Sequence, residues 1–429
     1  MFQIAVICLV ITALLAYVNA RFVRLPTTIG VMAVAMLLSL GLIGLKALGV
    51  ATPHVYEQSL LRSIDFTDVL MEGMLSMLLF AGALHVDLST LRAARWQIGL
   101  LAVVGTTVST AVVGLALWVA LPWVGLQLPL IHCLLFGALI SPTDPIAVLA
   151  ILRSAGAPQR LRMLISGESL FNDGVGVVLF ALLLGMATSG TVPSTHEAAL
   201  LLAHEAGGGL ALGVLIGVVA FLLLRSIDNY QVEVLLTLAT VLGGYELAQA
   251  LHVSGPLAMV VAGLIVGNQG RALAMSDQTR RHVDLFWELL DEILNAVLFV
   301  LLGLEIVLVP FSGSVAGAAL LALAVTLAAR WVSVGLPAAV LPGWFGLPAE
   351  GWKVLTWGGL RGGISVALAL ALPAGHERDA ILTMTYVVVI FSILVQGLTI
   401  KPLIARLPGS GAGGAAEGGA QEGGPVRPH

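Results

Sequence analysis

Charged residues are scarce in this sequence. They make up 10% of its 429 residues, while apolar residues make up 59% and the mean hydropathy is +1.02. A soluble globular protein carries about 25% charged residues, so a deficit of this size argues against a soluble multidomain protein. The composition instead predicts that most of the chain has lipid as its solvent.

Three other features are missing, and each absence removes a class of function. The net charge is only −4, with no block of like charge, so no nucleic-acid partner is expected. Cys8 and Cys133 are the two cysteines, and they lie too far apart to define a disulfide framework or a metal site. No HExxH, no GxSxG within an apolar run and no close histidine cluster is found, which argues against an intramembrane hydrolase. No cofactor is expected.

Long apolar stretches are what the sequence does contain. A membrane span needs about 20 mostly apolar residues, and this criterion predicts about 13 spans. The Gly/Ala-rich tail, residues 408–429, is expected to be disordered. The spans are predicted at residues 2–19, 27–50, 66–86, 96–121, 130–152, 163–187, 197–224, 231–251, 256–268, 282–309, 314–341, 351–372 and 379–407.

The basic residues orient these spans. With the N-terminus outside, most of the 20 Lys and Arg residues fall in cytoplasmic connections, and only Lys46, Arg62 and Arg378 fall in outer ones. This is the asymmetry of the positive-inside rule, and it predicts a cytoplasmic C-terminus. A cleaved signal peptide is the alternative for the first span, but the span lacks a basic leading region, and cleavage would invert the charge pattern.

Proline and glycine predict two broken helices. In "SPTDP" of the fifth span, Pro142 and Pro145 remove backbone donors, so the helix should break around residues 141–144. Asp144 would cap the new helix start, face a cation, or do both. In "GGLRGG" of the twelfth span, glycines flank Arg361, so a second break is expected there.

The sixth span holds the densest polar group. In "GESLFND", Glu168 precedes Asn172 by four residues and Ser169 precedes Asp173 by four, so the four side chains form two adjacent stripes on one helix. Oxygen donors alone suit a hard cation rather than a transition metal, although polar contact between helices is the alternative. Arg330 lies deep in the eleventh span and needs an anion, for which Glu168 is the most economical partner. Snorkelling to the interface is the alternative for Arg330.

The order of these features indicates two related halves. The two broken spans are seven spans apart, and an ionisable span follows each. Such an arrangement is typical of transporters built from inverted repeats, here spans one to six and eight to thirteen, joined by the seventh. Asp144 and Arg361 would neutralise the helix ends at the breaks. The predicted domains are scaffold and dimerisation helices (1–95), core helices (96–187), a linker helix (188–230), scaffold helices (231–310), core helices (311–407) and the tail (408–429).

Polar residues also occur in the tenth span, in "ELLDEILNAVLF". Asp291, Glu292 and Asn295 would line a cytoplasmic entrance if they faced the interior. An ordinary wet interface is the preferred interpretation, because the first turns of this helix are amphipathic.

The motifs "SPTDP", "GESLFNDGVGVV" and "GLRGGIS" together resemble those of the NhaP-type sodium/proton antiporters, a monovalent cation:proton antiporter family related to the eukaryotic sodium/hydrogen exchangers. The likeness extends to about Pro408. It implies an all-α polytopic fold like that of NhaA, with about 13 transmembrane helices in two inverted six-helix repeats and two crossed broken helices. It also implies a homodimer in the bacterial inner membrane, surrounded by membrane lipids.

The resemblance implies a role for each residue of the ion site. Asp173 would bind the cation or the proton. Thr143 (through its carbonyl) and Ser169 would be further cation ligands, and Asp144 would act directly or through water. Asn172, in place of a second Asp, would mark the electroneutral branch of the family.

The resemblance also assigns the intramembrane charges around that site. Glu168 and Arg330 would form a structural ion pair that holds Asn172 in place. Arg361 matches the arginine of the second broken helix.

One departure from the family concerns the third span. Several members have a glutamate there, in a stretch like Leu-Leu-Phe-Glu, whereas this chain has Ala81 in "LLFAGALHVDL". Glu72 lies nine residues earlier, about 13.5 Å along a helix axis, and is a poor substitute. Water or a backbone oxygen would have to fill the place, and the ion preference stays open.

These observations lead to one functional hypothesis. Na+ or Li+ is exchanged for H+ without net charge movement, because both compete for the carboxylate of Asp173 while alternating access opens the site to one side at a time. Na+ and H+ are then the transported substrates. A K+/H+ antiporter is the nearest alternative, and a passive cation channel and a transport-inactive membrane sensor are the others.

Overall fold

The computed structural model describes residues 2–47, 74–144, 148–149, 151–152, 155–189, 200–201, 203–305 and 313–407. Every regular element within these ranges is a helix, which confirms the all-α prediction for the part of the chain that the structure describes. Glu72, Pro145 and the predicted tail lie outside the described residues. By length and apolar composition, six of the described helical stretches are able to cross a membrane: Val6–Val23, Arg95–Val124, Gln159–Ser189, Ala203–Arg225, Val315–Val340 and His376–Ile404.

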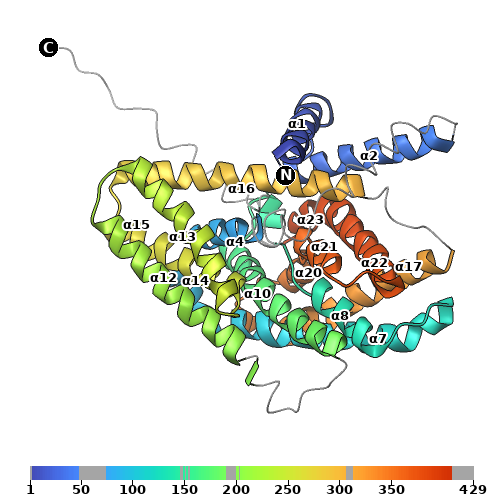
Figure 1. Cartoon of the computed structure of the whole chain (residues 1–429). Coiled ribbons are helices and arrows are strands. Elements are labelled where there is room, and N and C mark those ends of the chain that lie inside the picture. The colour runs from blue at the N-terminus through green and yellow to red at the C-terminus, as the bar shows by residue number, and fades with distance from the viewer. Residues whose placement is uncertain are drawn as a thin grey trace, which may run out of the picture.

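Figure 1 shows the arrangement of the α-helices. Short π-helical stretches continue several of them, for example η3 (Leu100–Gly105) between α6 and α7 and η9 (Ser392–Gln396) between α22 and α23. The helices are α1 (Phe2–Val18), α2 (Thr27–Ala47), α4 (Leu75–Leu84), α5 (Leu88–Ala93), α6 (Arg95–Gly99), α7 (Thr106–Ala120), α8 (Leu130–Ile140), α10 (Gln159–Ser189), α12 (Gly208–Arg225), α13 (Tyr230–Ala250), α14 (Gly255–Ile265), α15 (Arg271–Leu273), α16 (Asp277–Glu305), α17 (Gly313–Arg330), α18 (Leu336–Val340), α19 (Pro342–Phe345), α20 (Gly351–Trp357), α21 (Gly363–Leu370), α22 (His376–Phe391) and α23 (Gly397–Ile404).

Helix α12 shows how the sequence suits two different surroundings. One face is buried and carries glycines four residues apart, Gly209, Gly213 and Gly217. A Cβ at Gly213 would lie 2.6 Å from the carbonyl oxygen of Ala258 on α14, so only small residues allow this close packing. The opposite face exposes Val214, Leu215, Val218, Val219 and Leu222. A wide apolar outer surface of this kind is what a lipid environment favours.

The helices pack as two groups. The first helix group consists of α7, α8, α10, α17, α21 and α22, and the second consists of α2, α4, α12, α13, α14 and α16. Figure 1 shows α12–α14 on the left and α7, α8, α17 and α22 on the right, with α10 between them. The groups meet where α10 packs on α4 and α14, and where α16 packs on α21.

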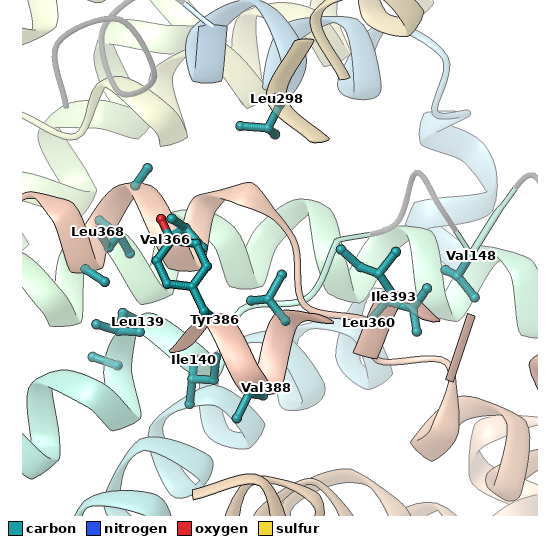
Figure 2. Close-up of a cluster of buried hydrophobic side chains, with 14 of the residues drawn as sticks. Leu139, Ile140, Val148, Leu298, Leu360, Val366, Leu368, Tyr386, Val388 and Ile393 are labelled. Atoms are coloured by element: carbon teal, nitrogen blue, oxygen red, sulfur yellow. The ribbon is translucent and has the colours of Figure 1, made fainter. Parts of the chain in front are cut away.

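Two helices are interrupted in the first helix group, and the interruptions touch. Helix α8 ends at Ile140, and the chain from Ser141 to Asp144 is not helical; between α20 and α21, residues 358–362 are not helical either. The Asp144 N–H donates to the carbonyl of Leu360 across the two breaks, at 2.8 Å. Apolar side chains surround this meeting point, among them Ile140, Leu360 and, from α16, Leu298 (Figure 2). The breaks therefore share one buried position.

The close approach of α14 to α4 predicts that a larger residue at this contact destabilises the protein. A Cβ at Gly263 would lie 2.8 Å from the Ala83 Cβ, whereas nothing lies within 4 Å of a Cβ at Gly243 in α13. Gly263→Ala should lower the free energy of unfolding by about 1–3 kcal/mol through overpacking. Gly243→Ala should raise it by up to about 1 kcal/mol through helix propensity. Thermal unfolding of the two purified variants in detergent measures both changes, and equal shifts would contradict this packing.

Candidate functional site

A small cavity lies beside the two helix breaks. Its volume is about 60 Å³, and a single buried water requires about 10–15 Å³. The cavity therefore has room for a few waters, or for a cation with a few waters. Apolar side chains and glycines form most of its wall, and the side chains that bring polar atoms are Asp144, Asp173, Asn295 and Ser365.

Asp173 is the central acid of this cavity. It lies on α10 and is only 4% exposed, and its carboxylate accepts no hydrogen bond from any described residue. Burying a carboxylate without a partner is unfavourable by several kcal/mol. A bound cation or proton would relieve that penalty, which makes Asp173 a candidate binding group.

Asp144 is held at the same cavity by backbone contacts. Its N–H donates to the Leu360 carbonyl, which fixes the residue at the end of the first break. Gly362 packs against its side chain, because a Cβ at Gly362 would lie 2.6 Å from the Asp144 Oδ2. A larger residue at position 362 would therefore displace the Asp144 side chain. Two carboxylates, one from the first break and one from α10, consequently line one small space.

Thr143, Ser169 and Asn172 form a hydrogen-bonded group between the first break and α10. The Thr143 N–H donates to the Asn172 Oδ1 at 3.2 Å, and the Asn172 Nδ2 donates to the Thr143 Oγ1 at 2.9 Å. The hydroxyls of Thr143 and Ser169 are 2.8 Å apart. All three residues are buried, and none of them lines the cavity described above. The structure thus brings together all five residues expected at the ion site, as a cavity pair and a hydrogen-bonded trio.

Glu168 and Arg330 form a buried ion pair. Both guanidinium Nη atoms donate to the carboxylate, with the Nη2–Oε2 contact at 3.0 Å, and Nη2 also donates to the Leu355 carbonyl at 3.2 Å. Glu168 is 1% exposed and Arg330 is 6% exposed. Arg330 therefore binds an internal anion and does not snorkel to the interface. The pair connects α10, which carries the site, to α17.

Arg361 connects the second break to the first. Its Nη1 donates to the carbonyls of Ser141 and Pro142 at 2.7 and 3.0 Å, and its own N–H donates to the Ser392 Oγ at 2.8 Å. The carbonyls at the end of a helix carry a negative partial charge and lack helical donors. Arg361 satisfies them at the end of α8, where water is scarce.

Helix α4 contributes only apolar residues and glycine to the cavity. Leu75, Leu78, Leu79 and Gly82 line it, at the spacing of one helix face. Ala81 does not line it and instead packs in a second apolar cluster that includes Trp287. The described part of the third span therefore supplies no carboxylate here.

Sequence reasoning missed two residues of the cavity wall. Asn295 is 1% exposed and lines the cavity, so its preferred interpretation as part of a wet interface is wrong. Its neighbour Glu292 is exposed and Asp291 is half-buried. The sequence signal for Asn295 was its position as a lone carboxamide in the otherwise apolar run 293–304. Ser365 follows the second break and offered no signal of its own.

Comparison with known proteins gives consistent matches. Residues 9–406 match the family described as "Sodium/hydrogen exchanger, transmembrane". The chain is 56% identical over 401 residues to the Na(+)/H(+) antiporter NhaP of Pseudomonas aeruginosa, covering 92% of this chain and 95% of that protein. It is 36% identical over 398 residues to the Na(+)/H(+) antiporter NhaH of Halobacillus dabanensis, covering 89% and 96%.

A solved structure shares the fold. The sodium proton antiporter MjNhaP1 from Methanocaldococcus jannaschii, solved at pH 8, superposes with a TM-score of 0.71. The alignment covers 94% of this chain and 97% of that chain at 19% sequence identity.

The buried ion pair predicts a large stability difference between two glutamates. Glu168→Gln leaves the Arg330 guanidinium buried without a counter-charge, which should cost about 3–5 kcal/mol. Glu350 pairs with Lys353 at the surface, where the side chains are 56% and 41% exposed, so Glu350→Gln should cost less than about 1 kcal/mol. Thermal unfolding in detergent compares the two. Equal losses would mean that the buried pair adds nothing to stability.

Proposed function

Because this chain belongs to the family of transmembrane sodium/hydrogen exchangers, we propose that it exchanges Na+ for H+ through competition for one carboxylate, that of Asp173. The chain is a multi-pass membrane antiporter, a secondary transporter and not an enzyme. The observation that carries the proposed mechanism is the Asp173 carboxylate itself, buried at a cavity and without a hydrogen bond from any described residue.

Competition follows from the charge of the site. An unpaired buried carboxylate is unfavourable, and either a proton or a monovalent cation neutralises it. Both together would leave a net positive charge in the same small space, so the arrival of one favours the departure of the other. Oxygen ligands suit Na+ and Li+, which are hard cations.

The neighbouring residues supply the remaining parts of the proposed site. Asp144 is a second cation ligand at the cavity, and Thr143 and Ser169 are further oxygen donors. Asn172 keeps Thr143 in place through two hydrogen bonds, which supports a positioning role. The ion pair of Glu168 and Arg330 fixes the turn of α10 that carries Asn172, four residues further on.

Electroneutral exchange is proposed from the balance of fixed charges. Arg361 binds the carbonyls that precede Asp144 by two and three residues, so a permanent positive charge accompanies that carboxylate. Asn172, next to Asp173, is neutral. The Asp173 carboxylate is then the one charge left for exchange. It binds one Na+ in one direction of transport and one H+ in the other.

Alternating access is proposed between the two helix groups. The first group corresponds to the core helices of residues 96–187 and 311–407, and the second to the scaffold helices of residues 1–95 and 231–310 with the linker helix. The packing of the described helices into these groups supports the division. We further propose about 13 spans in two inverted repeats, an outside N-terminus, a cytoplasmic C-terminus and a homodimer.

Asp173→Asn is the direct test of this function. The amide has no negative charge for which a proton and a cation could compete, so Na+-dependent proton flux should fall to the level of vesicles without the protein. The measurement is dequenching of acridine orange in everted vesicles with Na+, Li+ or K+ over a pH series. Glu292→Gln, an exposed site on α16, is the control and should keep the normal rate. Normal transport by Asp173→Asn would refute the single-carboxylate scheme, and flux with K+ alone would make this a K+/H+ antiporter.

One-for-one exchange predicts that the rate of transport does not depend on the membrane potential. In proteoliposomes, a potential set with valinomycin and K+ should leave the rate of Na+/H+ exchange unchanged, because no net charge crosses the membrane. An ionophore-clamped vesicle without potential is the control. A rate that follows the size and sign of the potential would show that net charge crosses the membrane, and would contradict one-for-one exchange.

A further inference from the structure

The cavity at Asp173 has a polar wall on the side of α16 and α21. Asn295 from α16 and Ser365 from the first turn of α21 both line it, and each is only 1% exposed. A polar residue at membrane depth is unfavourable unless it has a partner. Asn295 sits in a run that is otherwise apolar from Ile293 to Leu304, so its presence at this cavity needs a specific reason.

The orientation of the Asn295 carboxamide follows from its one hydrogen bond. Its Nδ2 donates to the Asp291 carbonyl at 2.8 Å, and a carbonyl accepts only from the NH₂ side of an amide. The nitrogen is therefore turned to the helix backbone. Among the described residues the Oδ1 has no donor, so an acceptor oxygen remains for the cavity.

Ser365 offers a second oxygen of the same kind. No described residue forms a hydrogen bond with its hydroxyl, although nearly all buried polar groups have a partner. Two neutral oxygens thus lie at the wall of the small space that also holds the carboxylate of Asp173. A set of hard oxygen atoms in a cavity with room for a few waters is a coordination site for a partly hydrated monovalent cation.

We propose that the Asn295 Oδ1 and the Ser365 Oγ coordinate the transported cation together with Asp173. This inference rests on the proposed function and names further residues of the same site. It also provides the oxygens that α4 does not supply, since Ala81 faces away from the cavity. Asp144 and water complete the shell.

The two ligands come from different helix groups. Asp173 and Ser365 lie on α10 and α21 of the first group, and Asn295 lies on α16 of the second, at the place where α16 packs on α21. A cation held by both groups is bound most tightly when they are close together. Movement of one group against the other would remove Asn295 from the shell and weaken binding, which couples release to the change of access.

Na+ binding and Na+ transport are both measured to test this. The rise in thermal unfolding temperature with Na+ reports binding to the folded protein, and proteoliposome flux gives the apparent KM and the maximal rate. Asn295→Ala should require roughly threefold to tenfold more Na+ in both measurements, as expected for one lost oxygen contact. Its maximal rate at saturating Na+ should stay within about twofold of normal, because Asp173 is intact.

Companion variants separate coordination from folding. Asn295→Ser keeps an oxygen and should recover part of the Na+ affinity, and Ser365→Ala should lose affinity by a smaller factor than Asn295→Ala. Loss of a neutral oxygen should also change the ratio of apparent KM values for Li+, Na+ and K+, which a purely structural defect would not do. Glu292→Gln, three residues from Asn295 but exposed, is the matched control.

The possible outcomes distinguish failure of this inference from failure of the proposed function on which it rests. Wild-type Na+ dependence in both Asn295→Ala and Ser365→Ala would overturn the inference, while the proposed function stands if Asp173→Asn is inactive. Equal loss of maximal rate with Li+, Na+ and K+ and no change in KM would also overturn it, since that pattern is structural. Absence of cation-dependent proton flux in the wild type would overturn both.

Discussion

The contact between the two helix breaks is what the rest of the site depends on. Helices interrupted inside a membrane leave backbone groups without partners, and lipid provides none. Here the two breaks provide hydrogen-bond partners for each other. Arg361 donates to the Ser141 and Pro142 carbonyls, and the Asp144 N–H donates to the Leu360 carbonyl. Because the breaks are held at one buried position, Asp144 is brought beside α10 and its Asp173.

The charges around this contact are almost all compensated, and the exception is informative. Glu168 is paired with Arg330, and Arg361 is bound to carbonyls at the end of α8. Thr143, Ser169 and Asn172 bond to one another. Against this background the carboxylate of Asp173 is left for an external partner. A site that must bind and release an ion needs one such group, and a rigid surrounding network keeps the others from competing for it.

Helix α16 contacts both helix groups and the cavity. It packs on α2 and α13 of its own group and also on α21, and it places Asn295 at the cavity wall. A residue that both groups share is sensitive to any displacement between them.

Features of the chain that depend on local composition were readable from the sequence. Apolar runs predicted helices in lipid, prolines and glycines marked both breaks, and the four-residue spacing in "GESLFND" placed its polar residues on neighbouring stripes of one helix. The pairing of Glu168 with Arg330 was also inferable, because a buried guanidinium needs an anion and few are available.

Only the tertiary structure decided which polar atoms face the cavity. The rotation of α4 about its axis turns Ala81 away and presents Leu78 and Gly82, and the rotation of α16 brings Asn295 inward. Each residue along a helix turns the side chain by about 100°, and that angle is set by packing against neighbouring helices. Sequence pattern determines that a helix has a polar position, whereas the neighbours determine what the position faces.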